Sequence, residues 1–217
     1  MLRFSEASRR LYPPYLSSLS PYSPDEVSNF VKEKIARAFS QREKRIIRDK
    51  GLVLSAVLVP LYECEGEYHI LFTKRTERVS SHRGQVSFPG GSYDEEDEDL
   101  KTTALRECFE EIGLRDKDVE ILGELDDEVS MSNYVMAPYV GYIPYPYEFK
   151  INENEIDEIF GVSLSTLLDR NNFREEDPEV LGGRSFARYF FQCQGYVIWG
   201  ATARILKHFL DLIFDQG

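Results

Sequence analysis

Three glutamates stand close together on one short stretch of the chain. Glu107, Glu110 and Glu111 follow the i, i+3, i+4 spacing that puts side chains on one face of a helix. Such neighbours repel by about 0.2–0.5 kcal/mol per close pair on an isolated helix, and Arg106 offsets only part of this through its i+4 partner Glu110. Carboxylate oxygens are the ligands that a hard divalent cation prefers, so the spacing predicts a metal site. A solvated acidic face is the alternative interpretation.

The helix that must carry these glutamates is predicted over residues 100–112. An acidic loop at 94–99 precedes it, and Gly113 ends it. Four apolar residues recur at i, i+3, i+4 and i+7 and predict its core-facing side: Leu105, Cys108, Phe109 and Ile112. We therefore expect the glutamates on the opposite, polar side.

Residues 106–114, with the sequence RECFEEIGL, resemble the R-E-U-x-E-E-x-G-U core of the Nudix box, where U is a bulky aliphatic residue. Every fixed charged or glycine position matches, and Cys108 replaces the first aliphatic residue. The box normally opens with a glycine at the place that Ser92 has here, and Gly91 stands one residue earlier, so the acidic loop is one residue longer. Asp97 and Glu98 are both candidates for the first glutamate of the box.

The resemblance implies a hydrolase that cleaves a diphosphate joined to another moiety, by attack of water at phosphorus. It implies Mg²⁺ or Mn²⁺ as the cofactor, because the charge on the phosphoryl oxygens must be neutralised and a water activated. By the same resemblance, Glu107 and Glu111 are the principal metal ligands, and Glu110 is a further ligand with a catalytic role. Arg106 is implied as the partner that orients them.

Two further positions join the site by resemblance. The turn at Gly90 and Gly91 would bring a backbone carbonyl close to the metal and the substrate, since neither residue has a side chain. Glu155 opens the segment EIDEIF, which resembles the E-V-x-E-V-F element of many Nudix domains and makes this residue a candidate base or extra ligand. A plain surface carboxylate on a polar Asn-Glu-Asn-Glu stretch is the alternative at Glu155.

A second motif, at residues 71–91, is similar to the L-L-T-x-R-[SA]-x3-R-x3-G-x3-F-P-G-G signature of the coenzyme A diphosphatase branch. Ser80 has the place of its second arginine, so Arg78 or Arg83 is expected to supply that charge. The tail at 197–206 resembles the W-G-x-T-A-R-I-L helix start of the same branch. Coenzyme A carries a diphosphate and a 3′-phosphate, and the expected substrate-binding residues are basic: Arg75, Arg78, His82 and Arg83. A solvated basic face that balances the acidic loop is the alternative.

These resemblances lead to one expected reaction and its rivals. We expect divalent-metal-dependent hydrolysis of coenzyme A or acyl-coenzyme A to 3′,5′-ADP and 4′-phosphopantetheine (or its acyl form). A close rival keeps the chemistry but uses ADP-ribose, a dinucleotide polyphosphate or an NDP-sugar. A non-catalytic nucleotide-binding regulator is the rival from another class, and the intact charged residues of the box argue against it.

The surrounding elements predict the α/β class, with a Nudix-type α/β/α sandwich, a mixed β-sheet and an N-terminal helical extension. Pro24 suits the first position of that extension's helix, with Ser23 as its cap. A second helix is expected at 201–214. We expect residues 1–50 to be an arm and a helix packing on the main domain, and 51–217 to be the Nudix domain. The predicted strands are 52–62, 68–74, 85–88, 119–125, 134–143, the start of 155–168, 184–192 and 196–199.

Composition narrows the class of partner. The chain has 217 residues and a formal net charge of −12, which argues against binding nucleic acid through bulk charge. No run of 18 apolar residues occurs, so no membrane span is expected. Three dispersed cysteines and a C-terminus unlike the S-K-L address lead us to expect a cytoplasmic enzyme. The N-terminal Tyr/Pro arm is a candidate homodimer contact. Trp199 and residues 134–149 are predicted as core or dimer contacts, with base stacking as the alternative.

Overall fold

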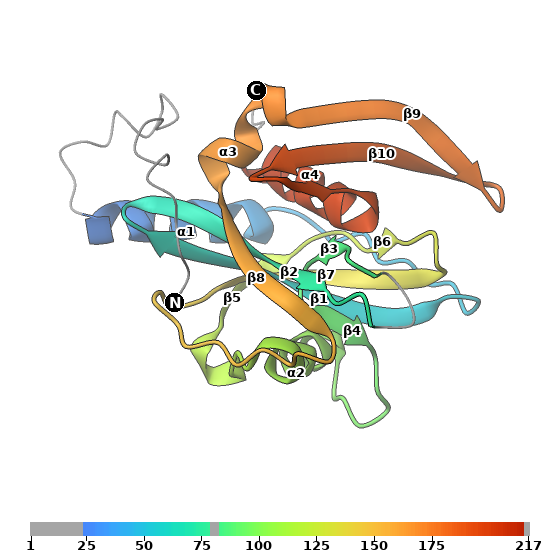
Figure 1. The fold of residues 1–217 in the computed structure, drawn as a ribbon, viewed down its shortest axis with the longest axis horizontal. Helices are drawn as coiled ribbons and strands as arrows, with labels where there is room; N and C mark the ends of the chain where they lie inside the picture. Colours follow the sequence, from blue (N-terminus) through green and yellow to red (C-terminus); the bar gives the residue numbers. More distant parts are fainter. Residues whose placement is uncertain (1–23, 79–82, 215–217) are drawn as a thin grey trace.

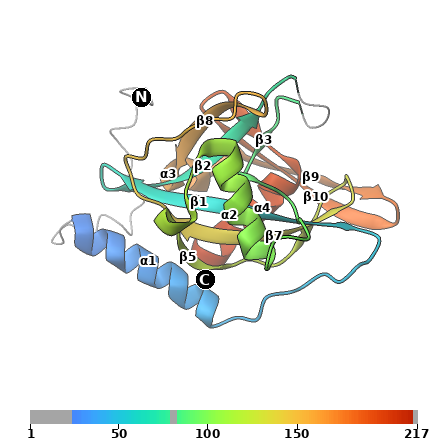
Figure 2. The ribbon, with the colours of Figure 1, turned by 90° about the horizontal axis from the view of Figure 1, so that it is seen from below.

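The computed structural model describes residues 24–78 and 83–214, with side chains described from residue 32 onward in these ranges. A mixed eight-stranded sheet forms its centre, and the main path of that sheet runs β3-β2-β1-β7-β5. Helix α2 covers one face, while α4 and α1 lie on the other (Figures 1 and 2). The predicted α/β/α sandwich with a mixed sheet is therefore confirmed.

The central strands are the long apolar ones. β1 (Val53–Cys64) runs parallel to β7 (Tyr134–Tyr142), in a register from Val53 opposite Tyr134 to Leu61 opposite Tyr142. The other strands of this sheet are antiparallel to their neighbours: β2 (Glu67–Arg75), β3 (Val86–Ser87), β4 (Gly90–Ser92), β5 (Glu120–Glu124), β6 (Glu128–Val129) and β8 (Ile156–Ser163). In this sheet, sequence patterns predicted the longer strands to within two residues at each end, and missed the short β4 and β6.

A second, three-stranded antiparallel sheet has the order β11-β10-β9. Its strands are β9 (Phe173–Leu181), β10 (Arg184–Cys193) and β11 (Tyr196–Ile198), and the predicted pair at 184–192 and 196–199 is confirmed. β9 was not predicted. No residue of this strand is buried, so its sequence is acidic, contains Pro178 and lacks an apolar alternation.

The helices are α1 (Pro24–Ser40), α2 (Leu100–Ile112), α3 (Leu164–Leu168) and α4 (Gly200–Phe214), with single 3-10 turns η3 (Asp116–Asp118) and η4 (Arg170–Asn172). α1 begins at the predicted Pro24, and the predicted cap Ser23 lies outside the described residues. Ile35 and Phe39 of α1 are buried, and the Phe39 ring occupies the space above Gly123 of β5. Within the described ranges, no helix is long and apolar enough to cross a membrane.

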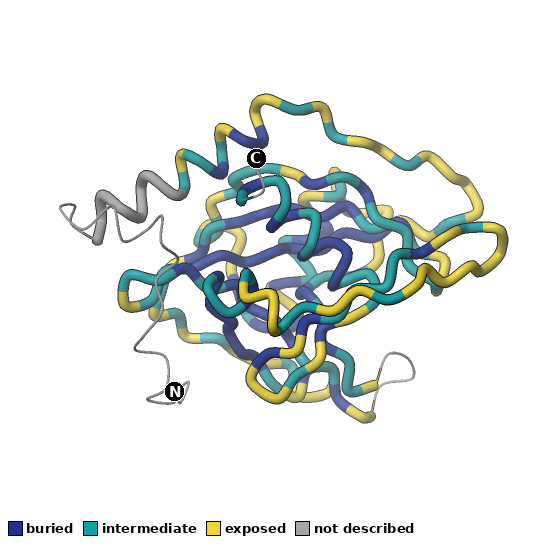
Figure 3. The backbone as a smooth tube through the Cα atoms, turned by 90° about the horizontal axis from the view of Figure 1, so that it is seen from above, coloured by how far each residue is buried: buried dark blue, intermediate teal, exposed yellow. Residues whose placement is uncertain are grey.

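Two apolar clusters hold the layers together (Figure 3). The larger cluster joins α1, α4 and the second sheet to one face of the central sheet. The smaller cluster lies under α2 and includes Leu58, Cys108 and Ile112. α2 is thus fixed on the sheet by its apolar residues, and its charged residues are held at defined positions beside the β3–β4 turn.

Candidate active site

Both ends of α2 carry the expected local signals. The side chain of Asp99 caps the helix, accepting a hydrogen bond from the Thr102 N–H at 2.8 Å. At the other end, Gly113 adopts the left-handed conformation (φ 69°), which ends the helix at the predicted residue. The helix and its boundaries are therefore confirmed.

The predicted orientation of α2 is partly wrong. Cys108 and Ile112 are fully buried as expected, but Phe109 is 58% exposed and Glu111 is only 3% exposed. The helix is rotated so that Ala104, Cys108 and Glu111 face the sheet. This rotation is possible because Glu111 finds polar partners beneath the helix, which a pattern based on apolar residues cannot reveal.

Glu111 lies between a backbone amide and an arginine. The Gly90 N–H donates to Glu111 Oε2 at 3.2 Å, and Arg75 Nη1 lies 3.2 Å from Glu111 Oε1. Arg75 also approaches Glu155, with Nη2 at 3.8 Å from Oε2. Burial raises the pKa of Glu111 to about 8, although the Gly90 amide and Arg75 act in the opposite direction. A buried carboxyl group with this pKa is one that a nearby cation would ionise.

Glu107 lies against the β4 backbone. A Cβ atom on Gly91 would stand 2.4 Å from the carboxyl carbon of Glu107, so only glycine leaves room for this side chain. Arg106 Nη1 donates to Glu107 Oε1 at 2.8 Å and approaches both Glu110 oxygens at 3.4 Å. Burial raises the pKa of Glu107, and Arg106 lowers it in part.

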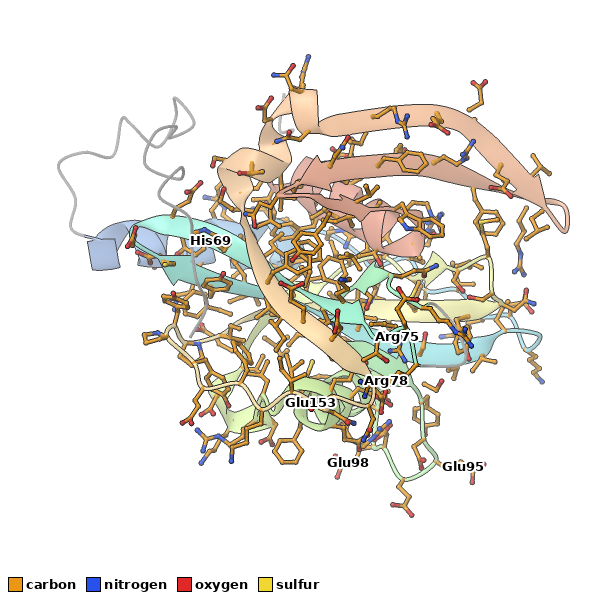
Figure 4. All side chains as sticks on the ribbon, viewed as in Figure 1. His69, Arg75, Arg78, Glu95, Glu98 and Glu153 are labelled. Atoms are coloured by element: carbon orange, nitrogen blue, oxygen red, sulfur yellow. The ribbon has the colours of Figure 1, made fainter. Side chains whose placement is uncertain are left out.

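The Arg106 guanidinium is itself fixed by Asp97. Arg106 Nε and Nη2 lie 2.9 and 3.0 Å from the two Asp97 carboxylate oxygens, and Thr103 Oγ1 donates to Asp97 Oδ2 at 2.8 Å. The hydrogen bonds from Arg106 lower the pKa of Asp97 to about 2, despite burial. Glu98 lies on the exposed loop at the lower edge of Figure 4. Of the two candidates for the first glutamate of the box, only Asp97 contacts the site.

The predicted basic residues have different surroundings. Arg75, at the end of β2, contacts Glu111 and Glu155, and its role at the phosphates of the substrate stays a prediction. Arg78 and Arg83 are exposed beyond the end of β2, and Figure 4 labels Arg75 and Arg78 in this region. His82 lies outside the described residues.

The predictions for the aromatic residues have different outcomes. Within 134–149, Tyr139 is buried, and Tyr145, Tyr147 and Phe149 pack against the smaller apolar cluster, as a core role requires. Trp199, in contrast, is 44% exposed, so the core part of its interpretation as a core or dimer contact is wrong, and the dimer contact stays a prediction. Trp199 lies at a strand-to-helix corner, and apolar patterning alone does not distinguish an exposed residue at such a corner from a buried one.

The residues fit a divalent cation in donor type and charge. Five carboxyl groups (Asp97, Glu107, Glu110, Glu111 and Glu155) face two arginines, Arg75 and Arg106, which leaves an excess of three acidic groups. Among the described residues, no three His, Cys, Asp or Glu side chains stand close enough to enclose an ion as they are, because the glutamates are turned toward the arginines. The oxygen donors, one of which lies directly above Gly91, suit a hard cation.

Fold and site together describe an α/β/α protein with a carboxylate-rich helix beside a glycine turn, and the comparisons with known proteins identify its class. A family model of the NUDIX domain matches residues 53–182. The uncharacterized Nudix hydrolase NudL of Photorhabdus laumondii is 36% identical over 152 residues, covering 70% of this chain and 80% of that protein. NudL of Yersinia pestis (strain Pestoides F) is 35% identical over 156 residues, covering 71% and 76%. The chain belongs to the Nudix family.

A solved structure agrees on the fold. The MutT/nudix family protein from Enterococcus faecalis superposes with a TM-score of 0.53 at 14% identity, covering 95% of this chain and 76% of that one. The protein is thus a Nudix hydrolase that acts on a diphosphate bond of a small nucleotide derivative, in a family that uses divalent metal ions.

Proposed function

We propose that this enzyme hydrolyses the diphosphate of coenzyme A or acyl-coenzyme A, releasing 3′,5′-ADP and 4′-phosphopantetheine or its acyl form. The observation that carries the chemistry is the convergence of Glu107, Glu111 and Glu155 beside the Gly90-Gly91 turn. The choice of substrate rests on the motif at residues 71–91, which resembles the coenzyme A diphosphatase signature.

The carboxylates would hold Mg²⁺ or Mn²⁺, with Glu107 and Glu111 as the principal ligands and Glu110 and the Gly91 carbonyl in support. When bound, such an ion neutralises phosphoryl charge and lowers the pKa of a bound water. Arg106, fixed by Asp97, holds Glu107 in place. Glu155, whose side chain is 44% exposed, is the carboxylate that can accept a proton from the attacking water. Arg78 and Arg83 would meet the phosphates, since Arg75 is engaged with Glu111.

The test is a side-by-side rate panel with Mg²⁺ and with Mn²⁺. It compares coenzyme A, acyl-coenzyme A, dephospho-coenzyme A, ADP-ribose, NADH and diadenosine polyphosphates. The highest kcat/KM is expected for coenzyme A or an acyl-coenzyme A. Preference for ADP-ribose or a dinucleotide would overturn the substrate, and binding without turnover of any compound would favour a regulator.

A pair of glycine variants connects the activity to the site. Gly91→Ala puts a methyl group where the Glu107 carboxylate lies, so kcat should fall by roughly 100-fold while the fold persists. Gly51→Ala is the matched control, because its new methyl would approach only Asp49 Oδ1, at 3.3 Å. Equal activities of the two variants would contradict the role of Glu107.

A further inference from the structure

Trp199 occupies a corner between two elements. β11 ends at Ile198 and α4 begins at Gly200, so this residue, the only tryptophan of the chain, joins strand to helix. It is 44% exposed, and the described residues offer its indole neither a hydrogen bond nor a ring contact. A large planar apolar group is therefore presented to solvent at one defined place.

Val197 and Trp199 stand on either side of Ile198 in the sequence, and their side chains are exposed where that of Ile198 is buried. Side chains alternate along a strand, and the intervening Ile198 is fully buried in the larger apolar cluster. Val197, like Trp199, is 44% exposed. The two side chains thus form a small apolar surface, which we call the 197/199 ledge.

The backbone holds this ledge rigidly. Ile198 pairs with Phe191 of β10, which fixes the strand side of the corner. Gly200 has a φ of 66°, a conformation that glycine adopts without strain, and α4 follows immediately. A rigid, exposed aromatic group loses little conformational freedom when a ligand covers it.

The ledge connects to the active site through β3. The Thr202 hydroxyl donates to the Val86 carbonyl at 3.4 Å, and Val86 pairs with Lys74 of β2. One residue along, the Arg75 N–H donates to the Gln85 carbonyl at 3.0 Å. Arg75 in turn contacts Glu111. About one helical turn, one hydrogen bond, one residue step along β3 and one strand spacing therefore separate the ledge from Arg75, a path of roughly 15 Å.

We propose that the 197/199 ledge receives the long uncharged arm of the substrate, beyond the phosphate on its non-nucleotide side. This inference rests on the proposed function, in which that arm is pantetheine or acyl-pantetheine. This path is longer than a nucleoside but no longer than a fully extended pantetheine. The ledge has no charge, which suits amide and methylene groups, whereas the nucleotide half carries the 3′-phosphate and requires cations.

Because Trp199 is the only tryptophan, its fluorescence reports on the ledge alone. The two products, 4′-phosphopantetheine and 3′,5′-ADP, are titrated separately into the Mg²⁺-loaded full chain, with binding measured in parallel by calorimetry. Phosphopantetheine should change the emission of Trp199 and reduce its quenching by acrylamide, and 3′,5′-ADP should do neither. A response to 3′,5′-ADP alone, or no response to phosphopantetheine although it binds, would overturn the assignment. Emission that depends on protein concentration rather than ligand would assign the ledge to a contact between copies.

Kinetics provide a second readout. Trp199→Ala should raise the KM for coenzyme A roughly tenfold with little change in kcat, and raise the KM for ADP-ribose, which lacks the arm, much less. Val180→Ser, at a 71% exposed position on β9, is the control and should alter neither constant. If the unmodified chain hydrolyses coenzyme A and Trp199→Ala leaves its KM unchanged, the ledge alone is overturned. If coenzyme A is not hydrolysed at all, the proposed function fails and this inference fails with it.

Discussion

At the scale of single residues, the site combines two carboxyl groups whose pKa values move in opposite directions. Burial raises the pKa of Glu111 to about 8, while the paired guanidinium of Arg106 lowers that of Asp97 to about 2. The two groups therefore have different roles in the metal-free protein. Asp97 stabilises the fold, whereas an ionised Glu111 destabilises it until a cation arrives.

Glu111→Gln tests the second of these roles. The folded-state pKa of Glu111 lies above its unfolded value, so its stabilising contribution is present at low pH and is lost as the pH rises through about 8. In EDTA, the Tm of the wild type should fall between pH 6 and pH 9. The Tm of the variant should fall less over this range, and at pH 9 it should be higher than that of the wild type. With Mg²⁺, the same variant should lose most turnover. Glu98→Gln, on the exposed loop, is the control, and identical pH profiles of Tm for wild type and Glu111→Gln would contradict the assignment.

Asp97→Asn tests the first role. Because the folded-state pKa of Asp97 is about 2, the carboxylate contributes stability above pH 4 that disappears as the pH falls toward 2. The variant should be about 2 kcal/mol less stable than the wild type at pH 7, with a smaller difference at pH 2.5. Urea unfolding at pH 7 and at pH 2.5 measures the difference in stability. A difference that is independent of pH would show that the Asp97 charge is not responsible.

At the scale of elements, α4 is bonded to two strands through one buried cation. The side chain of Arg204 is 8% exposed. Its guanidinium donates hydrogen bonds to Glu128 Oε1 at 2.7 Å, to the Val129 carbonyl at 2.9 Å and to the Ala187 carbonyl at 3.4 Å. These bonds join α4 to β6 and β10. The helix is thereby fixed at the end that carries Trp199 and Thr202.

Arg204→Met should therefore destabilise the protein by about 3 kcal/mol, because it leaves Glu128 and two carbonyls without their partner. Urea unfolding is the measurement. Arg188→Met offers a matched comparison, since Arg188 is 41% exposed and pairs with Glu176 at the surface, where such pairs contribute about 1 kcal/mol or less. Equal losses of unfolding free energy in the two variants would contradict the stabilising role of Arg204.

The elements that the sequence predicted are those with a clear apolar pattern or clear signals at their ends. β1 is an apolar run because both of its faces are covered, and α2 has clear signals at both ends. β9 was not predicted because none of its residues is buried, and Phe109 was misplaced because α2 turns Glu111 toward the Gly90 amide and Arg75. The same limit applies to the site: Glu107 and Glu111 follow from spacing and resemblance, but the contacts of Asp97 and Arg75 depend on tertiary structure. The exposure of Trp199, predicted as a core or dimer contact, also depends on tertiary structure.

At the scale of the whole molecule, α1 is part of the same core as the catalytic sheet. Phe39 packs over Gly123, and Ile35 is fully buried within the larger apolar cluster. The linker after α1 adds ion pairs to the β5–β6 region, including Lys44 with Asp127 at 2.9 Å. We therefore expect residues 51–217 to depend on the N-terminal extension for stability.

Phe39→Ala measures that dependence without truncation. The substitution should cost about 3–5 kcal/mol, since a buried ring is removed above a glycine that cannot fill the space. Phe109→Ala, at a 58% exposed position on α2, should cost less than 1 kcal/mol. Denaturant unfolding compares the two. Similar values would mean that the extension lies on the domain without stabilising it.

The parallel pairing of β1 with β7 has a consequence for how the chain acquires its structure. Val53 must find Tyr134, and the intervening loop contains both β2 and α2, so closing this pair requires a large loss of chain entropy. Because the paired residues are far apart in the sequence, the chain is expected to refold over roughly milliseconds to seconds rather than microseconds. During synthesis on the ribosome, α2 emerges before β7, and Glu155 emerges after both. The nascent chain therefore cannot bring all the carboxylates of the candidate site together until β7 and Glu155 have both been synthesised, well after α2 itself.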